Sequence, residues 1–137
     1  MTKIIQTESG EKLRKDILKT IGLTLELLTV KSSFDSETKD MVAFVVLALE
    51  KVAVTINESV AAWEKRGYWI KADHFRLEWD WAGEFAKQIK ICLQENDWTG
   101  MQNILARIQT KGIISSKSLR INGKPWKGAY FKLYRKK

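Results

Sequence analysis

The residues of this sequence best suited to chemistry are basic side chains gathered in one segment. Residues 111–137 carry nine Lys or Arg side chains and no Asp or Glu, so their formal net charge is +9. The rest of the chain comes to −1, because the whole chain carries +8 at pH 7. Charge concentrated in this way attracts a polyanion, such as nucleic acid, anionic lipid or an acidic protein face.

Aromatic residues are interleaved with these basic residues. Lys124 and Lys127 flank Trp126, and two tyrosines follow. Rings that stack on bases, beside lysines that neutralise phosphates, are the combination used on single-stranded nucleic acid. We therefore predict a binding surface that consists of Lys117, Arg120, Lys124, Trp126, Lys127, Tyr130, Lys132, Tyr134 and Arg135. The sequence supports an alternative equally, in which the aromatic residues fold the segment back onto the protein and the lysines only keep it soluble.

Catalytic and metal chemistry find little support in the sequence. His74 is the only histidine, and Glu78 lies about one helical turn beyond it, where the two could form an acid/base pair. No nucleophile motif accompanies them, so we interpret the pair as a structural hydrogen bond. One histidine and one cysteine, Cys92, are too few for a zinc or di-iron site, and no glycine-rich phosphate loop is present. We predict that the protein is not an enzyme and has no cofactor.

The elements that must position these residues are mainly helices. Apolar residues recur every three or four positions over most of residues 9–110, which is typical of helical faces. The helical pattern continues from 36 to 67 and its first half is apolar on several sides, so this helix belongs in the middle of a bundle. The predicted helix starts are Ser9, Asp35 or Ser36, the vicinity of Asp73, and Asn96 or Asp97.

The pattern changes after Gly112, where the sequence predicts a β-hairpin. Asn122-Gly123 is a strong signal for a two-residue hairpin turn. Beyond it, Ala129, Phe131 and Leu133 alternate with polar or amphipathic residues, as in a strand that starts near Gly128. The predicted fold class is mainly α, a bundle of about four helices with a C-terminal two-stranded β-hairpin. A winged helix that reads DNA is a minor alternative, because the central helix is too long for that compact core.

Length and composition favour one cytoplasmic domain. At 137 residues the chain suits a single domain, in which 9–110 form the helical bundle and 111–137 form a basic β-hairpin arm. A lone cysteine fits a reducing compartment, and the first residues lack the apolar stretch of a signal peptide. The most apolar run, 41–49, is too short to span a membrane.

The function predicted from these observations is binding without catalysis. The first hypothesis is a module whose basic C-terminal hairpin engages a polyanion, RNA or DNA before membrane. The alternative is an assembly or accessory protein that forms a homo-oligomer or docks onto an acidic protein partner. Six tryptophans in a chain of this length favour such an interface, because large rings are common in cores and in oligomer contacts.

Overall fold

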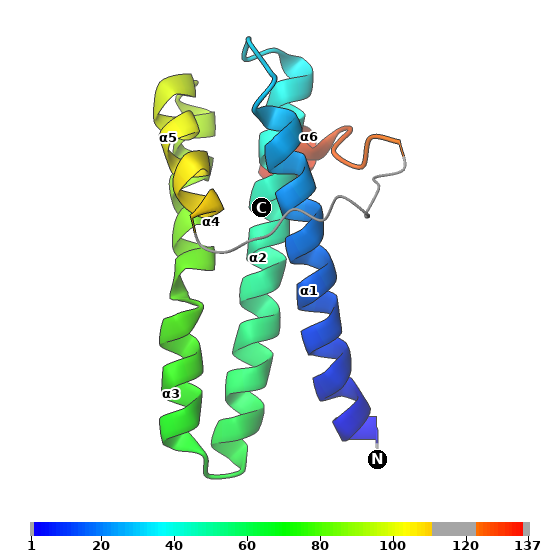
Figure 1. The fold of residues 1–137 in the computed structure, drawn as a ribbon, viewed down its shortest axis with the longest axis vertical. Coiled ribbons are helices and arrows are strands. Elements are labelled where there is room, and N and C mark those ends of the chain that lie inside the picture. The colour runs from blue at the N-terminus through cyan, green and yellow to red at the C-terminus, as the bar shows by residue number, and fades with distance from the viewer. Residues whose placement is uncertain (1, 111–122, 136–137) are drawn as a thin grey trace.

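The computed structural model describes residues 2–110 and 123–135, and within these ranges all regular secondary structure is helical. Helices α1 and α2 are antiparallel, and α3 and α4 follow each other along one side of α2 (Figure 1). No helix in the described ranges has the length and apolarity to cross a membrane. The helices are α1 (Thr2–Leu28), α2 (Ser36–Lys65), α3 (Trp69–Glu78), α4 (Asp80–Gln94), α5 (Trp98–Gln109) and α6 (Ala129–Arg135).

Helix α2 is the central element, as predicted. The carboxylate of Asp35 accepts hydrogen bonds from the backbone N–H of Thr38 at 2.8 Å and from its hydroxyl at 2.7 Å, which caps the first turn. The helix ends before Gly67, whose φ of 87° is a conformation that glycine adopts at little cost. Between these ends α2 contacts α1, α3, α4 and α6, so it lies in the middle of the bundle.

The two halves of α2 differ in how they are covered. In the first half the buried side chains lie on several sides of the helix: Met41, Val42, Ala43, Val45, Val46 and Leu49. The second half buries a single stripe, Val52, Thr55, Ile56 and Val60, while Val54 is 52% exposed. Burial of apolar side chains is the main stabilising term, so the core is concentrated around the first half.

Three of the predicted helix boundaries are wrong. The third helix, predicted to start near Asp73, begins at Trp69 as α3. Helix α1 begins at Thr2, seven residues before the predicted start at Ser9. The predicted third helix is divided at Trp79, a single residue with φ −110° and ψ 8° that separates α3 from α4. Gly83, which lies within α4, does not interrupt the helix, and a Cβ there would meet nothing within 4 Å. Instead the Trp79 ring stacks on Trp81, with centroids 5.7 Å apart.

Helix α5 agrees with the sequence prediction at its start. The Asp97 side chain accepts a hydrogen bond from the backbone N–H of Gly100 at 3.0 Å, which caps the first turn. Its buried residues recur with helical spacing and pack on the core: Met101, Ile104, Leu105 and Ile108.

The predicted C-terminal β-hairpin is contradicted. Its return strand falls on α6, and the described residues contain no strand, while the first predicted strand and Asn122 lie outside the described residues. A strand would have placed Ala129, Phe131 and Leu133 on one buried face. In the structure Ala129 and Leu133 are buried but Phe131 is 67% exposed, so burial follows the i, i+4 spacing of a helix.

Candidate functional site

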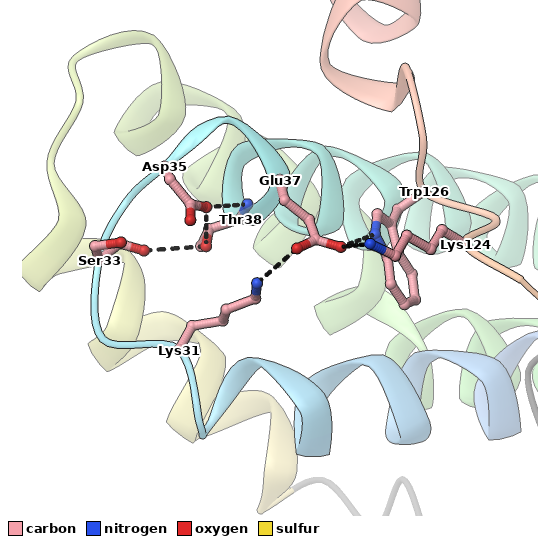
Figure 2. Close-up of polar contacts among 7 residues, drawn as sticks. All are labelled: Lys31, Ser33, Asp35, Glu37, Thr38, Lys124 and Trp126. Atoms are coloured by element: carbon pink, nitrogen blue, oxygen red, sulfur yellow. Dashed lines mark hydrogen bonds and ion pairs between the residues drawn. The ribbon is translucent and has the colours of Figure 1, made fainter.

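The described part of the basic segment, residues 123–135, docks onto the first turns of α2 through two carboxylates. Glu37 is the first of these (Figure 2). One of its oxygens accepts from the Lys31 ammonium at 2.8 Å. The other lies 3.0 Å from the Lys124 ammonium and accepts from the Trp126 indole N–H at 3.4 Å. Glu37 therefore joins the loop before α2 to the C-terminal segment.

The electrostatics of this contact favour ionised Glu37. Hydrogen bonds from Lys31, Lys124 and Trp126 lower the pKa of Glu37 from 4.5 to about 2. In return, the hydrogen bond to Glu37 raises the pKa of Lys31. The contact is thus made between fully charged groups at neutral pH.

Asp40, one turn further along α2, is the second carboxylate. Its two oxygens accept hydrogen bonds from the backbone N–H groups of Gly128, at 3.1 Å, and Tyr130, at 3.0 Å. These are amides at the start of α6 that have no partner within the helix, so a side chain distant in sequence completes the cap. Gly128 has a φ of 79°, which suits glycine and turns the chain into α6.

Three aromatic residues of the segment, Trp126, Tyr130 and Tyr134, face the bundle, whereas Phe131 is exposed. Trp126 is 6% exposed, and the rings of Tyr130 and Tyr134 pack edge to face with centroids 5.0 Å apart. The Tyr134 hydroxyl donates to the backbone carbonyl of Lys90 in α4 at 2.9 Å. Burial, with a smaller contribution from Tyr130, raises the pKa of Tyr134 to about 12, so the phenol remains protonated. The described residues therefore adopt the alternative arrangement, in which the aromatic residues fold the segment back.

The predicted binding residues therefore differ in their exposure and in their ion pairing. The side chains of Lys127 and Lys132 are exposed, and in the described part of the chain neither forms an ion pair. Lys124 is 64% exposed although it is paired with Glu37. Lys117 and Arg120 lie outside the described residues, and Arg135 lies in α6 with its side chain outside them.

The residues weighed for catalysis do not form a site. The predicted structural hydrogen bond between His74 and Glu78 is wrong: both side chains are exposed, and in the described ranges no hydrogen bond or ion pair joins them. Cys92 is buried, as predicted for a core thiol, and burial is the largest cause of its raised pKa. No group of three or more potential metal ligands is found among the described residues.

Two features of the structure were not predicted from the sequence. The first is Arg14 of α1, which is 7% exposed, donates to the Thr55 hydroxyl at 3.1 Å and lies over the Phe75 and Trp79 rings at 5.3 and 5.5 Å. Desolvation lowers the pKa of Arg14, while nearby Glu11 acts in the opposite direction. The cation–π contacts offset part of the cost of burying the charge. An arginine within an apolar heptad pattern gives little sequence signal for such burial.

The second feature is an exposed apolar face at the opposite end of the bundle. Around α3, large apolar residues face solvent: Tyr68 at 55%, Trp69 at 59%, Ile70 at 77% and Leu77 at 73% exposure. Helix α3 instead buries Ala72 and partly covers Phe75, so its contact with the bundle is on the side away from Leu77. Comparison with protein-family models, curated proteins and solved structures finds no match to this chain.

Proposed function

We propose that the protein is a non-enzymatic binding module whose basic C-terminal segment, 111–137, engages a polyanion, with nucleic acid as the first candidate. The observation that carries the proposal is the orientation of the docked residues. Trp126 and Tyr134 are turned toward the bundle, whereas Lys127 and Lys132 remain exposed. The segment also contains no acidic residue that could neutralise its nine basic ones.

Docking modifies the mechanism expected from the sequence. With its indole buried against Glu37, Trp126 has no free face on which a base can stack. Recognition is therefore by contacts of lysine and arginine side chains with phosphates, and α2 and α6 hold these basic side chains in position. Such contacts carry no base information, so the proposed binding is insensitive to nucleotide sequence.

The test is the salt dependence of binding by the full chain to labelled single-stranded and duplex DNA, measured by fluorescence anisotropy. With about five phosphate contacts, log K should fall against log salt with a slope of roughly −3.5 for single strands and −4.5 for duplex. In the double variant Lys127→Gln/Lys132→Gln, both slopes should become shallower, by roughly 1.4 and 1.8. Lys12→Gln/Lys15→Gln, with the same loss of charge on exposed positions of α1, is the matched control.

Three outcomes would contradict the proposal: no affinity for DNA or RNA at low salt, an unchanged slope in the segment variant, or an equal change in the control. The Trp126→Ala variant separates phosphate contact from stacking. A selective loss of single-strand affinity at an unchanged salt slope would instead indicate stacking on an undocked Trp126 ring.

A second candidate function is assembly, by homo-oligomer formation or by docking onto an acidic protein. The exposed apolar side chains at α3 favour it: Ile70 and Leu77 share one helix face, and exposed apolar surface of this kind is typical of protein interfaces.

A further inference from the structure

We infer that the outward face of α3 binds a second copy of this chain, with the two α3 helices side by side and parallel about a two-fold axis. This inference deepens the assembly function and does not depend on polyanion binding. It starts from helical geometry. At about 100° per residue, Ile70 and Leu77 lie almost one above the other, two turns apart. Both are more than 70% exposed, at 77% and 73%.

Charged and titratable side chains flank this apolar ridge on both sides. Around the helix axis, Asp73 lies about 50° to one side of this ridge and His74 about 50° to the other side. Their exposed side chains are thus at nearly the same height, midway between Ile70 and Leu77. Asp73 also forms an ion pair with Arg76, which in turn binds Glu64 of α2 at 2.7 Å, so its carboxylate is held on this side of the helix.

The positions of Asp73 and His74 indicate a second copy as the partner and a parallel orientation of the two α3 helices. A two-fold axis parallel to α3 sets each flank against the opposite flank of the second copy, so that Asp73 faces the second copy's His74. An antiparallel pair would set the Asp73 carboxylates against each other, which is unfavourable. The parallel arrangement also places Ile70 against its own counterpart and Leu77 against its own, whereas an antiparallel two-fold pair would place Ile70 against Leu77.

Area and charge argue for a second copy rather than a bilayer. Ile70 and Leu77 together expose on the order of 300 Å², and Trp69 lies about 90° further around the helix. This exposed area is below the roughly 800 Å² per partner of a standard stable interface, so it predicts a weak dimer that depends on concentration. A membrane surface would accept the apolar residues but would leave Asp73 against lipid with no second His74 to face it.

The first experiment is sedimentation velocity of the full chain from micromolar to millimolar concentration. Wild-type protein should pass from monomer to dimer, and Ile70→Ser/Leu77→Ser should remain monomeric. The matched control is Val30→Ser/Val54→Ser, which removes exposed apolar side chains from other parts of the surface and should dimerise normally. A monomeric wild type, a dimeric α3 variant or a monomeric control would each overturn the inference.

The second experiment determines the direction of the pair. Ile70→Cys should form a disulfide-linked dimer under mild oxidation, because the parallel axis brings position 70 next to position 70. Wild type, whose only cysteine is the buried Cys92, is the control. The parallel arrangement would be overturned if Ile70→Cys did not cross-link with itself and linkage appeared only when it was mixed with Leu77→Cys.

A third measurement tests the choice of partner. Co-sedimentation of the full chain with anionic vesicles, lost in Ile70→Ser/Leu77→Ser, would show that the α3 face binds a bilayer and would overturn the second copy as its partner. Absence of such co-sedimentation is the expected result. Because none of these measurements contains nucleic acid, their failure is distinct from failure of polyanion binding.

Discussion

The two ends of helix α2 have opposite surroundings. At its start, residues 123–135 lie across the helix and are held by the Lys124–Glu37 ion pair and by the Asp40 cap on α6. Beyond its last turn, α3 leaves Trp69 and Leu77 exposed to solvent. Residues 123–135 thus cover one end of the core, while the other end has no such cover within the described residues. The buried core and the proposed assembly face therefore lie at different ends of one helix.

Leucine-to-alanine substitution at each end gives the largest expected contrast. Leu49 is fully buried in the first half of α2, so Leu49→Ala should lower the free energy of unfolding by about 2 to 5 kcal/mol. The same change at exposed Leu77 should stay within about 0.5 kcal/mol at a concentration where the protein is monomeric. Urea denaturation followed by circular dichroism measures both. Equal losses at the two positions would remove the distinction between the ends.

Removal of the cap on α6 tests the covered end directly. Asp40→Ala leaves the amides of Gly128 and Tyr130 without their acceptor and should cost about 1 to 2 kcal/mol. Hydrogen exchange should accelerate in α6 before it does in α4 or α5. Asp16→Ala, at an exposed position of α1, is the control and should leave exchange in α6 unchanged. Uniform acceleration over the whole chain would argue that α6 and the core open as one unit.

Acid should weaken the same end through Glu37. Because the folded-state pKa of Glu37 is lowered from 4.5 to about 2, its contribution is complete above about pH 5. That contribution is lost as the pH falls from about 5 through about 2, since the protonated carboxyl no longer holds the Lys31 and Lys124 ammonium groups. Urea denaturation at several pH values should show the difference between wild type and Glu37→Gln shrinking over this range. A difference that is constant with pH would contradict the assignment.

Local signals were sufficient to predict part of the fold. The start of α2 at Asp35 and that of α5 at Asp97 depend on a capping side chain and the amides three residues ahead, so a short stretch of sequence contains all the relevant groups. The long apolar pattern between Ser36 and Gly67 likewise placed α2 at the centre.

The C-terminal helix and the α3 face could not be predicted in the same way. Residues 129–135 satisfy a period of two as well as the i, i+4 spacing of a helix, and a stretch of this length does not decide between them. The decision depends on Asp40, which lies 88 and 90 residues from the amides that it caps. The break at Trp79, which separates α3 from α4, likewise has no local sequence signal such as glycine or proline.

The contacts of Glu37 and Asp40 also bear on the order of folding. Their contacts with the C-terminal segment join positions 87 to 90 residues apart, so α6 can close over α2 only after α1 to α5 have been synthesised. Until then, the apolar surface at the start of α2 that Ala129 and Leu133 later cover remains exposed to other chains. Contacts this distant along the chain slow folding, because a long loop must close before they form. The nascent chain is therefore expected to be most prone to aggregation just before its basic segment emerges.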